Sequence, residues 1–182
     1  MNSITRMVRS SACVVAALVL AAPVLHAQSL PQTRQGLWFS GGLGVGSFGC
    51  EDCDDRETGP TAQISLGGTV SPRLQLGASL NMWTKKVAGV RLTQSALLAL
   101  AKFYPTVTSG FFLQGGAGFG QARASFDGES ESETGPSLMV GAGYDFRVAP
   151  NVSLTPFVNA VGGRFDGANT NFVQLGLSVT GH

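Results

Sequence analysis

Apolar and polar residues alternate strictly through residues 60–84, and this pattern predicts two β-strands joined by a short turn. Successive side chains of a strand point to opposite faces, so each strand has one apolar and one polar face. The apolar face carries Ala62, Ile64, Leu66 and Val70 before the turn at 71–73, and Leu74, Leu76, Leu80 and Met82 after it. The opposite face carries Gln63, Ser65, Gln75 and Asn81. No helical period fits this stretch.

The same alternation recurs along the chain and predicts further strands at residues 36–48, 90–104, 111–124, 136–148, 152–160 and 171–181. Residues 90–104 also have good helix propensity, and we expect a strand there with a β-bulge near Ser95. The longer connections fall at 50–59, 85–89, 125–134 and 162–169, and the short turns contain Pro72, Pro105 and Pro150. This order predicts an all-β fold, an eight-stranded antiparallel up-and-down barrel with both termini at the short-turn end.

The polar face of the predicted strands consists mainly of Gly, Ser, Thr, Gln and Asn, which suits the narrow lumen of a membrane barrel. Charged residues make up 13% of the chain, whereas about a quarter is usual in soluble proteins. Asp145 is the one acidic residue expected inside a strand; the others fall in the longer connections. We therefore expect the apolar face to contact lipid. A secreted, soluble ligand-binding barrel is the alternative.

Aromatic residues gather near the predicted strand ends, as expected for girdles at the two membrane interfaces. Those near the short turns are Trp38, Phe39, Phe103, Tyr104, Phe111, Tyr144 and Phe146, and those near the longer connections are Phe48, Trp83, Phe119 and Phe172. Trp83 also falls on the lumen face, where with Phe112 and Phe157 we expect it to narrow the channel.

The N-terminus has the features of an export signal. Arg6 and Arg9 precede an apolar run that is too short to span a bilayer as a helix, and residues 25–27, Leu-His-Ala, approximate the small-x-small pattern of a cleavage site. We expect residues 1–27 to be a cleaved signal peptide, residues 28–35 a short segment, and residues 36–182 the barrel domain. The formal net charge of +1 gives no indication of a nucleic-acid partner.

Several motifs resemble those of the small eight-stranded outer-membrane β-barrels that include the OmpA transmembrane domain and OmpX. They are LWFSGGLGVG at 37–46, FFLQGGAGFG at 111–120, GAGYDF at 141–146 and QLGLSV at 174–179. The resemblance implies a monomer in the outer membrane of a Gram-negative-type bacterium, inserted by the barrel-assembly machinery. Gln174 and Gly176 match the family's C-terminal assembly signal, whereas Val179 and Gly181 replace its aromatic residues.

Cys50 and Cys53 are close in the sequence, and in an oxidising compartment we expect them to form a disulfide that closes a loop. The neighbouring carboxylates disfavour a redox-active thiolate, and zinc would need more soft ligands. The acidic residues of the connections are candidates for divalent-cation or surface contacts, although solvated loop tips are the simpler interpretation. These residues are Glu51, Asp52, Asp54, Asp55, Asp127, Glu129, Glu131 and Glu133.

Three charged residues, Lys102, Asp145 and Arg147, are expected inside the barrel near the short-turn end, where an internal ion-pair network would neutralise them. A proton or ion path is the alternative. A His-dependent hydrolase is disfavoured because His26 leaves with the signal peptide and His182 lies at the short-turn end.

The sequence therefore predicts a non-enzymatic outer-membrane barrel without a cofactor or metal. Its expected role is structural, or surface interaction through acidic extracellular loops, with outer-membrane lipid and lipopolysaccharide as partners. A small pore or ion-conducting channel is the alternative function within the membrane.

Overall fold

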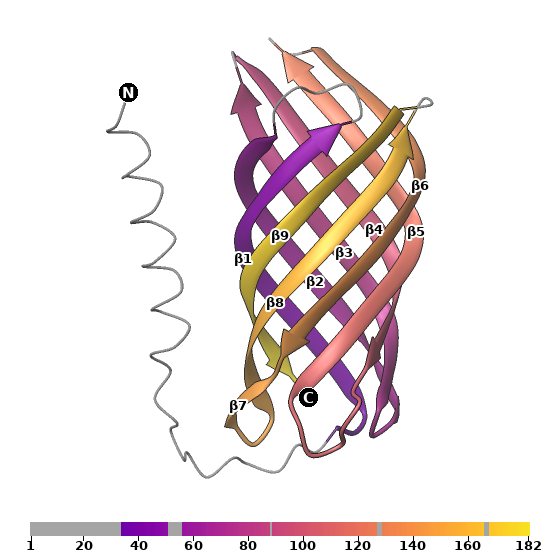
Figure 1. Ribbon diagram of the computed structural model, residues 1–182, viewed down its shortest axis with the longest axis vertical. Helices are drawn as coiled ribbons and strands as arrows, with labels where there is room; N and C mark the ends of the chain where they lie inside the picture. The colour runs from indigo at the N-terminus through magenta and orange to yellow at the C-terminus, as the bar shows by residue number, and fades with distance from the viewer. Residues whose placement is uncertain (1–33, 51–55, 88, 127–128, 166–167) are drawn as a thin grey trace, which may run out of the picture.

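The computed structural model describes residues 34–50, 56–87, 89–126, 129–165 and 168–182, which form a closed antiparallel β-barrel (Figure 1). Its strands are β1 Leu37–Cys50, β2 Glu57–Ser71, β3 Leu74–Val87, β4 Val90–Phe103, β5 Phe111–Phe126, β6 Glu129–Tyr144, β7 Phe146–Ala149, β8 Val152–Phe165 and β9 Ala168–Gly181. Neighbouring strands pair in sequence order, and β1 closes the barrel by pairing with β9. The described residues include no helix with the length and apolar character needed to cross a membrane.

Strands β6 and β7 are two parts of one wall of the barrel, because both pair with β8. Counted as one strand, they bring the number of strands among the described residues to eight, as the sequence predicts. Asp145 lies at the break between them, so the expectation that it falls inside a strand is wrong. Its backbone N–H donates to the carbonyl oxygen of Gly110 at 2.9 Å instead of to a sheet neighbour.

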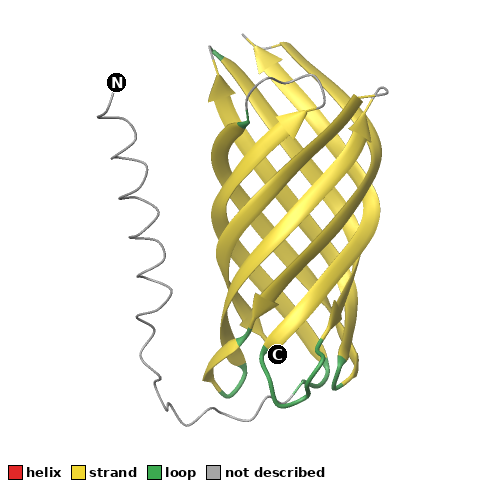
Figure 2. Cartoon of the chain, in the orientation of Figure 1, coloured by secondary structure: helices red, strands yellow, loops and turns green. Residues whose placement is uncertain are grey.

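The strands are longer at the loop end than the alternation predicts. The expected loop at 125–134 is a hairpin, because β5 continues to Phe126 and β6 begins at Glu129. Glu57 also lies in a strand, so the acids are less segregated from the strands than expected. Backbone pairing continues beyond the apolar band because the ladder of hydrogen bonds needs no hydrophobic side chains. Figure 2 shows the short turns gathered at the opposite, lower end of the barrel.

The apolar face of the strands points outward and the polar face points into the lumen. Leu66, Leu138 and Val140 are each at least 60% exposed, whereas Gln63, Ser65 and Asn81 are buried. The predicted orientation of the two faces is thus confirmed. The predicted bulge near Ser95 is wrong, since β3 and β4 pair without a register shift from Leu74 opposite Phe103 to Val87 opposite Val90.

Glycines on the lumen face let the walls of the barrel approach closely. Gly67 of β2 stands opposite Gly77 of β3, and a Cβ atom on Gly67 would lie 2.1 Å from the carbonyl oxygen of Leu76. A Cβ on Gly77 would meet the carbonyl oxygen of Leu66 at the same distance. Strong coiling of a small barrel therefore accounts for glycine at these two positions.

The predicted aromatic girdles are correct for some residues and wrong for others. Phe39, Phe103, Phe111 and Phe146 face outward near the short turns, and Phe119 faces outward nearer the loop end. The exceptions are buried in the lumen: Trp38, Tyr104, Trp83 and Phe172. Their ring surfaces fill the interior, as Phe112 and Phe157 also do.

Candidate functional site

The lumen contains a buried cluster of charged and hydroxyl groups near the short-turn end. The Asp145 carboxylate accepts hydrogen bonds from Tyr104 Oη at 2.8 Å and from Thr155 Oγ1 at 2.7 Å. Lys102 is buried on β4, and its Nζ lies 4.3 Å from the centroid of the Trp38 ring. Charge-assisted hydrogen bonds and the cation–π contact both offset the cost of burying these ions. Asp145 is also close enough to Lys102 for their opposite charges to attract each other.

Arg147 is half-buried on β7 beside this cluster, and its Nη1 donates to the carbonyl oxygen of Pro150 at 2.6 Å. The three charged residues expected in the lumen therefore lie at one end of it. The sequence did not indicate that Tyr104 and Thr155 bind the carboxylate, because these contacts join residues 41 and 10 positions away from it.

Arg34 extends the cluster to the segment before β1. Although it lies outside the predicted barrel domain, it is 3% exposed, and its guanidinium carbon stands 3.6 Å from the centroid of the Tyr104 ring. Its nitrogens donate to the carbonyl oxygens of Val107 at 3.1 Å and Ser109 at 2.5 Å, both in the β4–β5 connection. The segment before β1 thus packs against the short-turn end of the barrel.

The middle of the lumen is bridged by amide side chains from opposite walls. Asn159 of β8 donates to Gln63 of β2 at 2.7 Å and accepts from Gln114 of β5 at 2.5 Å. Gln174 of β9 donates to Asn81 of β3 at 2.8 Å. These side chains fill the middle of the lumen, as expected for a barrel of eight strands, whose interior is just wide enough for side chains.

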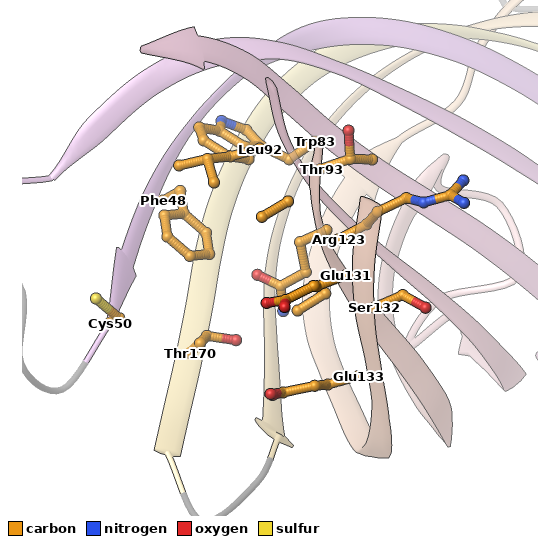
Figure 3. Close-up of a pocket in the computed structure, with 13 residues that line it drawn as sticks. Phe48, Cys50, Trp83, Leu92, Thr93, Arg123, Glu131, Ser132, Glu133 and Thr170 are labelled. Atoms are coloured by element: carbon orange, nitrogen blue, oxygen red, sulfur yellow. The ribbon is translucent and has the colours of Figure 1, made fainter. Parts of the chain in front are cut away.

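A recess of about 370 Å³ opens at the loop end (Figure 3). Its apolar wall includes Phe48, Trp83 and Leu92, and the two rings are stacked with centroids 4.7 Å apart. Trp83 Nε1 donates to the carbonyl oxygen of Gly46 at 3.1 Å, which fixes the indole in place. Gln94 also lines the recess.

Glu131 and Glu133 of β6 lie at the edge of this loop-end recess. Figure 3 shows both carboxylates on the side of Thr170, whereas the Arg123 and Ser132 side chains point the other way. Arg123 donates to Ser130 Oγ at 3.2 Å on that other face of the hairpin. The recess thus combines an apolar wall with an acidic edge.

The remaining acidic and cysteine candidates are placed only in part. Cys50 ends β1, but Cys53 lies outside the described residues, so the disulfide stays a prediction. Glu51, Asp52, Asp54, Asp55 and Asp127 also lie outside the described residues, whereas Glu129 is exposed at the start of β6. Within the described ranges, no three His, Cys, Asp or Glu side chains are grouped to hold a metal ion.

His182 follows β9 at the short-turn end, where its Nε2 lies 3.2 Å from Ser153 Oγ. Ser153 is fully buried. A serine nucleophile must reach its substrate, so this pair suits packing better than hydrolysis. The pKa of His182 is lowered to about 4, mainly by burial. Nearby charges act in both directions, since Asp145 raises this pKa and neighbouring basic groups lower it.

Basic residues form an outward-facing cluster at the loop end, composed of Lys86, Arg91 and Arg123. Lys86 of β3 stands directly opposite Arg91 of β4, and Arg123 follows on β5; all three are exposed. Like charges directly opposite one another are destabilising unless an anion lies between them. Lys85, by contrast, forms an ion pair with Glu57.

An apolar outer band, a polar lumen and complete sheet closure together define a transmembrane β-barrel. The sequence matches the outer membrane protein beta-barrel domain over residues 14–180, and the chain belongs to that family. The family places it in the outer membrane. No curated protein sequence matches the chain significantly.

Two solved structures share the fold. The crystal structure of Neisserial surface protein A matches with a TM-score of 0.69 and 18% identity, covering 82% of this chain and 98% of that one. Ail, the attachment invasion locus protein of Yersinia pestis, matches with a TM-score of 0.53 and 19% identity, covering 81% of this chain and 99% of that one. At these identities the likeness shows the fold alone.

Proposed function

We propose that this chain is a non-enzymatic outer-membrane barrel that acts as a monomer and contacts partners outside the cell through its loop end. The observation that carries the proposal is the β5–β6 hairpin. Strand β6 pairs with β8 only from Ser137 onward, so its residues from Glu129 to Gly135 pair with β5 alone. This hairpin extends past its β8 neighbour and carries Glu129, Glu131 and Glu133.

Carboxylates on a projecting hairpin favour partners with basic surfaces. The test compares cells that display the wild-type barrel with cells that display a Glu129→Gln/Glu131→Gln/Glu133→Gln variant. We expect wild-type cells to adhere to a surface coated with basic protein, and the variant cells to adhere less. Both must show equal amounts of folded barrel by heat-modifiability on SDS gels. Equal adhesion of the two cell types to basic, neutral and acidic coatings would contradict the proposal.

The pore alternative is disfavoured by the contents of the lumen. Aromatic rings, amide bridges and the Arg34 contacts fill or close it between the loop-end recess and the short turns. We expect no steady channel events in planar bilayers. Regular conductance steps from the purified, folded barrel would restore the pore as the function.

Lipopolysaccharide is the partner we propose within the membrane. The outward cluster of Lys86, Arg91 and Arg123 stands at the loop end, where the phosphate groups of this lipid would lie. Phosphate groups placed between these positively charged side chains would relieve their mutual repulsion. Export through a cleaved signal peptide and insertion by the barrel-assembly machinery complete the proposed route to the membrane.

A further inference from the structure

The loop-end recess has an apolar wall that is formed before any ligand arrives. The indole of Trp83 is fully buried, fixed by its hydrogen bond to Gly46 and stacked on Phe48. Leu92 packs against the same cluster. The volume of about 370 Å³ lies at the lower end of the range of small-molecule sites, which is roughly 300–1,000 Å³.

Gln94 gives this recess an unsatisfied polar group. It is 1% exposed and lines the recess, and neither its Nε2 nor its Oε1 has a hydrogen-bond partner among the described residues. Thr170 Oγ1, also in the lining, likewise has no hydrogen-bond partner among the described residues. A buried amide without partners is costly, so a molecule that both donates to and accepts from Gln94 is favoured there.

The acidic edge selects the charge of the ligand. Glu131 and Glu133 are exposed at the edge of the recess, and Arg123 does not neutralise them because it points to the other face of the hairpin (Figure 3). Lys85 is already paired with Glu57. The field at the entrance therefore attracts cations and repels anions.

We propose that the loop-end recess binds a small amphipathic cation: an ammonium group, one amide-like group and an apolar body about the size of an aromatic ring. The apolar body would contact Phe48 and Leu92, the amide would pair with Gln94, and the ammonium would lie near Glu131 and Glu133. A purely apolar molecule leaves Gln94 unpaired, and an anionic amphiphile is repelled. This inference deepens the proposed surface role, because the recess opens at the loop end.

The probe is phenylalaninamide, which carries all three groups. It is titrated by calorimetry into the full-length barrel in lipid nanodiscs, free of detergent. N-acetylphenylalaninamide keeps the ring and amide without the charge, and N-acetylphenylalanine carries a negative charge. We expect affinity to fall in that order, with the binding of phenylalaninamide weakened by salt.

Two variants separate the contributions of the amide and the carboxylates. Gln94→Leu should weaken phenylalaninamide and N-acetylphenylalaninamide alike, by about three- to tenfold for one lost hydrogen-bonded group. Glu131→Gln/Glu133→Gln should weaken phenylalaninamide alone, by about fivefold, because the carboxylates are exposed. Glu129→Gln, on the same strand but outside the lining, is the matched control and should bind as wild type.

Three results would overturn the proposal: no binding of phenylalaninamide by the folded barrel at about 10 mM, equal binding of the anionic probe, or unchanged affinity in both variants. The glutamates are exposed, so their replacement leaves the buried lumen intact even if Gln94→Leu fails to fold. Absent probe binding with adhesion retained rejects the recess ligand alone. Equal adhesion of wild-type and Glu129→Gln/Glu131→Gln/Glu133→Gln cells, with probe binding by the wild-type barrel retained, rejects the surface role alone.

Discussion

The side chain of Arg34, which lies outside the sheet, connects several elements at one end of the barrel. Its guanidinium packs on Tyr104, whose hydroxyl in turn donates to Asp145. The same guanidinium satisfies two carbonyl oxygens of the β4–β5 connection. One residue thus links the segment before β1 to the buried cluster and to a turn.

Replacing Arg34 with Ala should lower the free energy of unfolding by about 2–3 kcal/mol, since charged hydrogen bonds and a cation–π contact are lost together. Arg34→Lys should recover part of this loss but not the planar stacking. Urea unfolding of the barrel in lipid vesicles, followed by tryptophan fluorescence, measures both. Arg73→Ala, in the β2–β3 turn, is the control and should change stability little. Equal stability of the Arg34 and Arg73 variants would contradict the assigned role.

His182 provides a pH-dependent measurement at the same end. Burial is the largest cause of its lowered pKa of about 4; nearby charges act in both directions, Asp145 raising the value and Arg147, Lys102 and Arg34 lowering it. Because the folded-state value lies below the unfolded one of about 6.5, protonation favours unfolding. The contribution of His182 to stability is therefore complete above about pH 6.5 and is lost as the pH falls toward 4.

The imidazole resonances of His182 should accordingly show no titration between pH 7 and 5 by NMR. A His182→Asn variant should lose the part of the acid sensitivity that arises in this range. A midpoint near 6.5 in the folded barrel would mean that the imidazole is solvated and the predicted sensitivity absent.

At the scale of the strands, pairing brings together residues that the sequence separates. Lys86 and Arg91 meet because β3 and β4 keep an uninterrupted register up to Val87 and Val90. Both face outward beyond the apolar band, beside Arg123 of β5. Such a position suits phosphate groups at the membrane surface.

A Lys86→Gln/Arg91→Gln variant should retain less lipopolysaccharide when the barrel is purified in nanodiscs containing it. Each basic group near an anionic surface contributes about 1 kcal/mol, so the affinity should fall about tenfold or more. Arg73→Gln removes a positive charge at the opposite end and should retain the wild-type amount. Equal retention by all three proteins would remove the basic cluster from the proposed contact.

The sequence predicted the strands well where apolar and polar residues alternate, because one face must meet lipid over that length. It failed at the loop end, where Ser130 and Glu131 pair with β5 although their side chains form no apolar face. It also placed Trp38 and Tyr104 in the girdle because they stand near strand ends, although alternation with the outward-facing Phe39 and Phe103 puts both on the lumen face. The unpaired amide of Gln94 was unpredictable, because it depends on side chains contributed by distant strands.

At the scale of the whole molecule, the two ends of the barrel have different chemistry. The short-turn end is closed by Arg34, Tyr104 and Asp145 and is linked by buried hydrogen bonds. The loop end instead has an open recess with an apolar wall and exposed carboxylates. A filled lumen lies between the two ends, which supports the proposed surface contact over the pore alternative.

Whether the outward face of the barrel contacts lipid can be tested by moving a charge along one strand. Leu66 and Val70 share the outward face of β2 and are 60% and 65% exposed, but Val70 lies next to the short turn. Arginine costs about 2–4 kcal/mol near the bilayer midplane and about 0–1 kcal/mol near the interface. Leu66→Arg should therefore lower the yield of heat-modifiable barrel in outer membranes, while Val70→Arg, the matched control, should assemble nearly as wild type. Equal assembly of both variants would mean that this face does not contact the hydrocarbon core.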